Sequence, residues 1–481
     1  MARLTLEEIA RVTRGTLEFG ATPPAQGAQH VVQGYSIDSR SAGPGDLFFA
    51  IVGPRHDAHL FVDDAMRRGS AAAVVSRGTR VTHPSAPALI RVQDTTRALQ
   101  DLGAHVRRRR PLTVVGITGS AGKTTAKEMT AAVLSQAGPT FKSEGNLNNT
   151  YGLPLVLLRL PEDHATAVLE MGMSYHGEIA RLVEIADPDV GVILNVLRVH
   201  LEHVGSLDEI ARAKGELFAG LRRDGTAVYN ADDPPTARLG RAFPGRRVAY
   251  GIATATAEVT AADVATEDLE TTRFSLVHGT VRLPVRLALP GRHNVYNALA
   301  AAAVGFTLGL DAEAVRRGLE TVRPAAMRGV VHRLADDIVV LDDSYNSNPA
   351  AMERAIETLR GATSHGRRVL VSGDMLELGP YETTAHTRLG EQAAAAGIDL
   401  FVAVGPLSRR AHDAARAAGR DSRHFDDSEK AAAWVAAALR PGDLVLVKGS
   451  RGARMERVVQ AILAARGTGT TGGTGTTGGS R

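Results

Sequence analysis

The sequence predicts an α/β protein with three domains, and two observations carry this prediction. Between about residues 111 and 323, short apolar runs alternate with segments of helical character, which indicates a mostly parallel sheet covered by helices. From about residue 324 the alternation begins again, which predicts a smaller, doubly wound, Rossmann-like domain. We therefore divide the chain into residues 1–107, 108–323 and 324–466, followed by a Gly/Thr-rich tail, 467–481, that we expect to be disordered.

The elements follow in chain order. The N-terminal part is predicted to be a small α/β module with strands that include 47–52 and 71–76. The expected central strands are 167–171, 190–196 and 226–229, with helices near 207–221 and 295–308. Polar and apolar residues alternate at 258–289, which predicts an antiparallel ribbon there. The expected C-terminal strands are 338–342, 368–372, 400–404 and 444–447, with helices between them.

Length and composition describe a large enzyme-sized protein. Its 481 residues are enough for about three domains. No apolar run approaches the roughly 20 residues that cross a bilayer, and the N-terminus lacks an export signal, so we expect a cytoplasmic protein without stable membrane insertion. The absence of cysteine excludes disulfides, thiolate catalysis and cysteine-bound zinc. A net charge of +4 and an aromatic content of 4% argue against nucleic acid as a partner.

The most informative segment is Gly116–Thr125, which reads Gly-Ile-Thr-Gly-Ser-Ala-Gly-Lys-Thr-Thr. It lies between an apolar run and a helix-like segment, so backbone N–H groups and a helix N-terminus can face an anion. Lys123 adds a point charge and Thr124 a hydroxyl for a magnesium ion, and the segment therefore predicts nucleotide binding. The loop is shorter than a strict Walker A loop, because its first glycine is Gly119.

Lysine is rare in this chain, which has 50 Arg but only six Lys, at positions 123, 127, 142, 214, 430 and 448. A chain that prefers Arg keeps Lys where a compact charge, or an amine that can be deprotonated or modified, is needed. Lys123 is one such position. Lys214 and Lys448 become candidates on the same ground.

Further polar residues follow the predicted strands around this loop. Glu170 ends an apolar strand, and a carboxylate at that end of an open α/β sheet points into the ligand crevice. The next strand ends at Asn195 and is followed by His200, which either completes a magnesium site with Glu170 or is a structural histidine. Lys214 lies on the following predicted helix and, taken alone, is interpreted as a surface lysine.

Three more segments have open interpretations. Asn294 and Asn297, at the start of an Ala-rich helix, either cap that helix or bind an adenine edge. The polar turn at 342–349 follows a strand and indicates recognition of a polar ligand, although Asp and Asn favour such turns anyway. The basic run Arg107–Arg110 is interpreted as a solvated linker edge, with phosphate steering as the alternative.

Taken together, these segments resemble the ATP-dependent Mur ligases of bacterial cell-wall synthesis. The resemblance covers about residues 30–460 in order. The segments that carry it are 119–125, 146–150, 170–172, Asn195 with His200, the helix of Lys214, 291–294 with Asn297, 342–349, 373–379 and 448–451. The turn Asp343–Pro349 resembles that of the D-Ala-D-Ala-adding members. Residues 37–40 and 45–48 resemble the UDP-binding module of the late-acting members, with Ala58 where Gly is common.

The resemblance implies an amide ligase that adds D-Ala-D-Ala to UDP-N-acetylmuramoyl-tripeptide, with ATP and Mg²⁺ as cofactors. A substrate carboxylate would attack the γ-phosphate of ATP, giving ADP and an acyl phosphate, and the amine of D-Ala-D-Ala would then displace phosphate. ATP would lie between the central and C-terminal domains, and catalysis would require their closure. The two small-molecule substrates are the expected partners, and we expect a monomer.

The resemblance also implies residue roles. The expected catalytic residues are Lys123, Glu170, His200 and Lys214. The expected metal ligands are Thr124, Glu170, His200 and Lys214, the last matching a lysine that is carbamylated. The expected ATP contacts are Gly119, Ser120, Ala121, Gly122, Lys123, Thr124, Thr125, Asn294, Asn297, Arg328 and Asp343. The UDP-substrate is assigned to Ile37, Ser39, Arg40, Asn149 and Thr150, and the acceptor side to Tyr345, Asn346, Asn348, Lys448 and Arg451.

Two alternative functions remain at this stage. One is a related ATP-dependent amide ligase with a different acceptor, of the folylpolyglutamate or cyanophycin type, against which the uridine-type N-terminal module argues. The other is a P-loop ATPase that drives motion, which would have the longer Walker A loop that this chain lacks.

Overall fold

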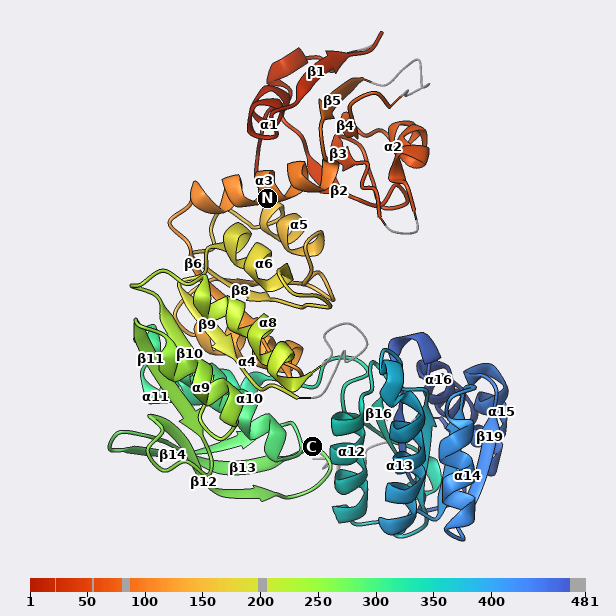
Figure 1. Ribbon diagram of the computed structural model, residues 1–481. Coiled ribbons are helices and arrows are strands. Elements are labelled where there is room, and N and C mark those ends of the chain that lie inside the picture. Colours follow the sequence, from red (N-terminus) through yellow and green to blue (C-terminus); the bar gives the residue numbers. More distant parts are fainter. Residues whose placement is uncertain (22, 54–55, 80–86, 198–205, 468–481) are drawn as a thin grey trace, which may run out of the picture.

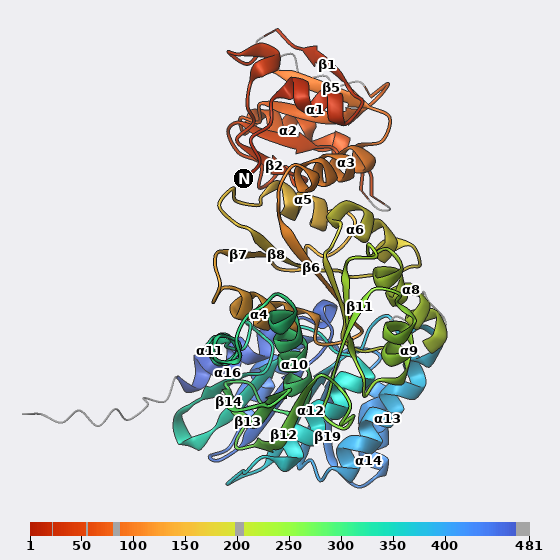
Figure 2. The same ribbon diagram turned by 90° about the vertical axis from the view of Figure 1, so that its left-hand side faces the viewer.

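Three β-sheets follow one another along the chain, each with helices against it, in the computed structural model (Figure 1). The structure describes residues 1–21, 23–53, 56–79, 87–197 and 206–467. The N-terminal sheet lies at one end of the molecule and the C-terminal sheet lies beside the central one, as Figures 1 and 2 show. Within the described residues, no helix is both long and apolar enough to span a membrane.

The N-terminal sheet has five strands, of which only the edge strand β1 is antiparallel to its neighbour. In spatial order they are β1 (Thr16–Phe19), β5 (Ala88–Val92), β4 (Ala72–Ser76), β3 (Asp46–Phe49) and β2 (Gly34–Ser36). The helices of this unit are α1 (Leu6–Val12), α2 (Val62–Arg67) and α3 (Thr95–Arg108). Helix α3 packs on strands β3 and β4 of this sheet and on two helices of the central unit, α5 (Gly152–Leu158) and α6 (Glu178–Ala186), so it joins the two units.

The central sheet has nine strands. In spatial order they are β14 (Val281–Leu287), β13 (Thr272–His278), β12 (Val259–Thr266), β11 (Arg246–Gly251), β10 (Thr226–Asn230), β9 (Val190–Ile193), β6 (Thr113–Thr118), β8 (Thr166–Glu170) and β7 (Thr140–Lys142). The pairs from β7 to β12 are parallel, and β12, β13 and β14 pair antiparallel. The predicted parallel sheet and the predicted ribbon at 258–289 are thereby confirmed.

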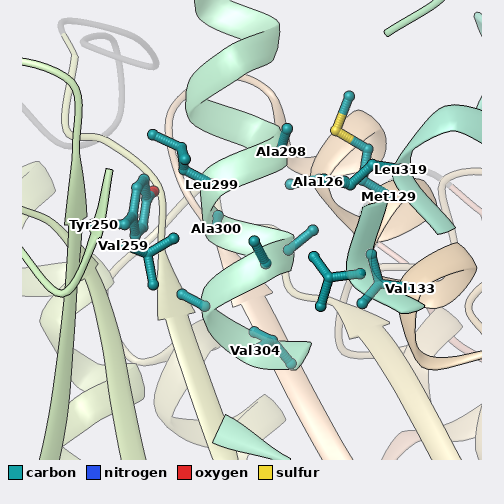
Figure 3. Close-up of a cluster of buried hydrophobic side chains, with 14 of the residues drawn as sticks. Ala126, Met129, Val133, Tyr250, Val259, Ala298, Leu299, Ala300, Val304 and Leu319 are labelled. Carbon is teal, nitrogen blue, oxygen red and sulfur yellow. The ribbon is translucent and has the colours of Figure 1, made fainter. Parts of the chain in front are cut away.

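The helices of the central unit are α4 (Lys123–Leu134), α5 (Gly152–Leu158), α6 (Glu178–Ala186), α8 (Leu207–Ala219), α9 (Pro234–Ala242), α10 (Arg292–Thr307) and α11 (Ala312–Thr321). The Ala-rich helix α10 lies in the buried core beside α4 and strands β11 and β12 (Figure 3). Small residues allow this close approach, since a Cβ added at Gly305 would lie 2.8 Å from Cγ1 of Val133 on α4. The packing brings the start of α10 close to the start of α4, where the Gly-rich loop ends.

The C-terminal sheet has six strands, and only its edge strand β15 is antiparallel. In spatial order they are β15 (Val330–Arg333), β16 (Val339–Asp343), β20 (Leu444–Lys448), β17 (Arg368–Gly373), β18 (Leu400–Val404) and β19 (Asp421–Phe425). Its helices are α12 (Pro349–Gly361), α13 (Glu382–Ala395), α14 (Arg409–Ala417), α15 (Ser428–Ala438) and α16 (Glu456–Arg466). This is the doubly wound arrangement that the sequence predicts, and its crevice lies where β16, β20 and β17 end.

The predicted strands and helices lie where expected, with ends shifted by a few residues. The prediction from the sequence did not include several strands, because their local sequence patterns are weak. Strand β11 begins with two exposed arginines, β19 is mostly polar, and β7 has only three residues. Pairing with neighbouring strands, which a local pattern does not contain, stabilises all three.

The arginine run at the end of α3 corrects our interpretation of it as a solvated linker edge. Arg107, only 5% exposed, donates hydrogen bonds to the carbonyl oxygens of Ala186 at 2.8 Å and Asp187 at 2.9 Å. These carbonyls end helix α6, where helical partners are missing. Arg110 likewise donates to the carbonyl of Glu162 at 2.7 Å. The run therefore fastens α3 to the central unit.

Candidate active site

A cleft with a cavity volume of about 650 Å³ lies between the central and C-terminal sheets. Side chains from the Gly-rich loop, the end of β8, the start of α10 and the turn after β16 line it. The predicted site residues that line this cleft are Ser120, Ala121, Gly122, Lys123, Thr124, Thr125, Asn149, Glu170, Asn294, Asn297, Arg328, Asp343, Tyr345, Asn346, Asn348 and Lys448. Tertiary structure therefore gathers residues that are more than 300 positions apart in the sequence.

The loop between β6 and α4 contains glycine where a larger residue would not fit. Gly122 has a φ of +85°, and a Cβ there would lie 2.5 Å from Oδ1 of Asn297. A Cβ at Gly119 would lie 2.9 Å from the Cβ of Leu194. Lys123 Nζ donates a 2.9 Å hydrogen bond to the Gly119 carbonyl and so spans the loop. The loop is closed around the start of α4, where unpaired N–H groups can receive an anion.

Asn195 holds this loop to the end of β9, a role that sequence reasoning did not assign to it. Its Oδ1 accepts from the Ala121 N–H at 2.9 Å, and its Nδ2 donates to the Ala121 carbonyl at 3.0 Å. The Ser120 hydroxyl accepts from the Leu197 N–H at 2.8 Å. The sequence contained one signal for this role, because Asn195 is a polar residue at the carboxyl end of a strand. It was also part of the family resemblance.

Glu170 is a nearly buried carboxylate at the end of β8, 4% exposed. Its Oε2 accepts from the Thr124 hydroxyl at 2.9 Å, and its Oε1 accepts from Asn148 Nδ2 at 2.8 Å. Its backbone N–H donates to the Ser143 hydroxyl at 3.0 Å. The hydroxyl, the carboxylate and the amide oxygen of Asn148 are the hard donors that suit Mg²⁺. Sequence reasoning missed Asn148 as a site residue, although it lies in the Asn-rich segment 146–149.

Lys214 is buried, at 2% exposure, so its interpretation as a surface lysine is wrong. Burial lowers its pKa well below the ordinary value, and the nearby charge of Lys123 lowers that pKa further. Burial also lowers the pKa of Lys123, while Glu170 acts in the opposite direction. Compared with an exposed lysine, a larger fraction of Lys214 is therefore neutral. His200, the other expected metal ligand, lies outside the described residues.

The two asparagines of α10 do not cap that helix. The N-cap is Gly291, and Asn294 instead donates from Nδ2 to the Pro290 carbonyl at 2.8 Å. Asn297 Nδ2 donates to Oδ1 of Asn294 at 3.2 Å. Both side chains are about 5% exposed. They connect the start of α10 to the Gly-rich loop through the contact of Asn297 with Gly122.

On the C-terminal wall, Lys448 ends β20 beside the turn after β16. Its Nζ donates to Oδ2 of Asp343 at 2.5 Å and to the Asn346 carbonyl at 3.0 Å. Asn348 uses Oδ1 to cap α12, accepting from the Ala351 N–H at 2.9 Å. The polar turn is thus held by its own capping residue and by a lysine of the neighbouring strand.

An aromatic ring connects the two guanidinium groups near this turn. The guanidinium of Arg328 lies 4.1 Å from the ring centroid of Tyr345, a cation–π distance. That of Arg451 lies 6.0 Å from the same centroid and pairs with Glu456 at 2.8 Å. Arg451 does not belong to the cleft lining, unlike the other predicted acceptor-side residues.

The predicted UDP-side residues divide into two groups. Asn149 lines the cleft, whereas Ile37, Ser39, Arg40 and Thr150 do not. Arg40 pairs with Asp38 on the N-terminal unit, and the Thr150 carbonyl accepts from Gln100 of α3. The structure does not bring these residues together in one cavity. Ala58, the departure from the family pattern, lies in a short helix with an ordinary backbone conformation.

His293 and Arg354 are cleft-lining residues that sequence reasoning missed. His293 is exposed at the cleft surface. Desolvation by the surrounding residues lowers its pKa, the cations Arg354 and Lys448 lower it further, and Asp343 acts in the opposite direction. No local signal indicated Arg354, because only the structure shows which face of α12 lines the cleft.

Comparison with known proteins agrees with this geometry. Residues 117–305 match the Mur ligase middle domain, and residues 327–451 match the glutamate ligase domain of Mur ligases. The UDP-N-acetylmuramoyl-tripeptide–D-alanyl-D-alanine ligase of Escherichia coli (strain K12) is 39% identical over 96% of this chain and 99% of its own length. The enzyme of the same name from Bacillus subtilis (strain 168) is 35% identical over 96% of this chain and 99% of its own length.

Solved structures give the same result. A crystal structure of MurF from Acinetobacter baumannii has a TM-score of 0.86 at 32% identity, covering 96% of this chain and 99% of that one. MurF ligase from Thermotoga maritima, solved in complex with ADP, has a TM-score of 0.77 at 29% identity, covering 90% of this chain and 98% of that one. The fold, the cleft and these similarities together show that the chain belongs to the Mur ligase family.

Proposed function

We propose that this chain joins D-alanyl-D-alanine to UDP-N-acetylmuramoyl-tripeptide, using ATP and an acyl-phosphate intermediate. Relatives named for this reaction align with the chain over 99% of their own length. The observation that carries the proposal is the single cleft in which a phosphate-binding loop, the carboxylate of Glu170 and the polar turn after β16 meet.

In the first step, a carboxylate oxygen of the tripeptide attacks the γ-phosphorus of ATP, and the bond from that phosphorus to the β-phosphate oxygen breaks. ADP leaves, and the carboxylate has become an acyl phosphate with a good leaving group. The residues that we assign to the nucleotide are the loop 119–125, Asn294, Asn297, Arg328 and Asp343. Lys123 and the loop amides would hold the phosphates and neutralise the charge that develops on them.

Magnesium fits the donor set at the base of the loop, where the Thr124 hydroxyl already contacts the Glu170 carboxylate. We assign the ion to Thr124, Glu170, His200 and a carbamylated Lys214. The ion would supply charge neutralisation at the phosphates. Lys214 is suited to the modification because its amine is buried with a lowered pKa. A neutral amine can add carbon dioxide, releasing one proton and leaving a carboxylate on Nζ.

In the second step, the amine of D-alanyl-D-alanine attacks the acyl carbon. A carbon–nitrogen bond forms, and the bond between the acyl carbon and the phosphate oxygen breaks. Phosphate leaves with the electron pair of that bond, and the nitrogen releases a proton to the solvent. We assign the acceptor to Tyr345, Asn346, Asn348, Lys448 and Arg451. Alignment of the amine with the acyl carbon is the main task here, and closure of the central and C-terminal units would exclude water.

The N-terminal unit, residues 1–107, completes the proposal as the domain for the UDP end of the substrate. The UDP end is assigned to Ile37, Ser39 and Arg40 of this unit and to Asn149 and Thr150 of the central unit, and closure would have to bring the first three toward the cleft. Residues 108–323 and 324–466 are the proposed ATP-binding and C-terminal domains. We propose that the enzyme acts as a monomer in the cytoplasm, where ATP is available.

A coupled phosphate-release assay tests this function. Phosphate release should require ATP, UDP-N-acetylmuramoyl-tripeptide and D-alanyl-D-alanine together, and mass spectrometry should find the pentapeptide product. Replacing the dipeptide with glutamate or arginine tests the alternative amide ligases. Release that needs neither cosubstrate, or that needs a different acceptor, would refute the proposal. Comparing lysine and diaminopimelate tripeptides would then define the substrate further.

A further inference from the structure

Helix α12 presents one face to the cleft. Its cleft-lining residues are Ala351, Arg354, Ala355 and Thr358, which are spaced three to four positions apart and therefore share one side of the helix. Arg354 is the charged member of this face, and the two alanines beside it leave room around its guanidinium. The face begins directly after the polar turn, in which Asn348 caps the helix.

The guanidinium of Arg354 is partly buried and unpaired within the described part of the chain. The structure shows no hydrogen bond or ion pair to it among these residues. Asp343, Glu353 and Glu357 act on its charge from a longer range. Burial lowers the pKa of Arg354, but a guanidinium stays protonated in a protein. Desolvation of this partly buried cation costs free energy, which these three carboxylates offset in part and a bound anion would offset further.

Other cations that line the cleft are already engaged. Lys448 donates to Asp343 and to the Asn346 carbonyl, and Lys123 donates to the Gly119 carbonyl. Arg328 lies over the ring of Tyr345. Arg354 therefore has unused hydrogen-bond capacity in a cleft whose proposed ligands all carry anionic groups.

We propose that Arg354 is a substrate-binding residue of this cleft that holds an anionic oxygen of a substrate. This inference rests on the proposed function, in which all three substrates carry anionic groups. We assign to Arg354 either the phosphates of ATP or the terminal carboxylate of D-alanyl-D-alanine, because the polar turn beside its helix carries residues assigned to these two substrates. The planar guanidinium donates two parallel hydrogen bonds, and both phosphate and carboxylate accept this geometry. The other residues of this face, two alanines and Thr358, carry no charge and cannot bind an anion in this way.

Two variants and a matched control test the inference. Arg354→Gln removes the charge, Arg354→Lys keeps it without the fork, and Arg360→Gln changes an exposed arginine on the same helix. We expect Arg354→Gln to raise the KM for one anionic substrate by about tenfold or more, the range of a charge-assisted hydrogen bond. Arg354→Lys should recover part of this loss. Arg360→Gln should behave as the unmodified chain, and all variants should keep its thermal unfolding midpoint.

The affected substrate identifies the anion. A raised KM for ATP together with weaker ADP binding would indicate a phosphate. A raised KM for the dipeptide alone would indicate the carboxylate, and the dipeptide amide should then bind the unmodified chain and Arg354→Gln equally weakly. Unchanged KM values for both substrates, or a lower kcat alone, would overturn the inference. Calorimetric binding of ADP and of the dipeptide measures the same effect without turnover, so a failure of the proposed function would be distinguishable.

Discussion

The Thr124 hydroxyl donates a 2.9 Å hydrogen bond to Oε2 of Glu170, which connects the first turn of α4 to the end of β8. The other oxygen of this carboxylate accepts from Asn148 at 2.8 Å. Both oxygens of Glu170 are therefore oriented before any ligand binds. Such prior orientation reduces the cost of forming a cation site at the loop.

Replacing this carboxylate is the first prediction. Glu170→Gln keeps the shape of the side chain but removes its charge, so we expect the rate of phosphate release to fall by roughly 100-fold or more, as when a charge-stabilising group is lost. The thermal unfolding midpoint should change little. Glu162→Gln, on an exposed loop, is the control and should keep full activity. A Glu170→Gln enzyme with normal kcat would contradict the assigned role.

The buried amine of Lys214 gives a second prediction. Lys214→Ala should abolish most ligase activity, because the variant cannot form the carbamate that we assign to the metal site. Added short-chain carboxylates such as formate or acetate should restore part of the activity by occupying the vacated space. Lys430→Ala, an exposed lysine, should show neither loss nor rescue. Normal activity of Lys214→Ala would argue against the modification.

The arginine run predicts a difference between two adjacent residues. Arg107→Ala leaves the carbonyls at the end of α6 without their donors and should lower the free energy of unfolding by about 2–3 kcal/mol. Arg108→Ala is the matched control, since Arg108 is exposed and makes one long bond of 3.4 Å. Urea unfolding should show a change of less than about 0.5 kcal/mol for the control. Equal effects of the two substitutions would contradict the stabilising role of the Arg107 hydrogen bonds.

A pH-dependent prediction concerns Asp232. Its carboxylate accepts backbone N–H bonds from Ile252, Ala253 and Thr254 and the hydroxyl of Tyr296. Burial alone would raise the pKa of Asp232, but these hydrogen bonds lower it to about 2. The unfolded chain, with an Asp pKa near 3.9, therefore binds more protons than the folded one between these values.

Asp232 should thus stabilise the fold fully above about pH 5, and its contribution should disappear as the pH falls through 4 toward 2. Asp232→Asn should lose on the order of 1–2 kcal/mol at pH 7, after allowance for solvent screening, and less at pH 4. Urea unfolding at both pH values measures this difference. Asp426→Asn, an exposed carboxylate paired with Arg409 and Lys430, should show little change at either pH. A constant difference between the two pH values would contradict the linkage.

Local sequence patterns predicted much of the fold. The alternation of apolar and helical segments located the main strands of the central and C-terminal sheets, because strand and helix periods are local properties. Strands with a weak local pattern, such as β19, were not predicted, because pairing with a neighbouring strand stabilises them. The Gly-rich loop and Glu170 were found for the same local reason, as each belongs to a motif at the end of an apolar run.

Other site residues depended on tertiary contacts. Nothing near Lys214 in the sequence indicates that its amine is buried and close enough to Lys123 to feel its charge, so its burial was missed. Arg354 likewise lies on a helix whose orientation the sequence leaves open. Asn294 was interpreted as a cap or a base contact. It does not cap α10, and its bonds to Pro290 and Asn297 could not be read from the sequence.

By itself, the sequence determined the α/β class, the order of the sheets and the presence of a Gly-rich loop between a strand and a helix, because these follow from residue periodicity and short motifs. The tertiary structure decided which residues meet. The contact of Gly122 with Asn297 and the bond of Thr124 to Glu170 join segments that are far apart in the chain. Such contacts depend on how helices pack against sheets, and packing is set by side-chain shapes from many segments at once.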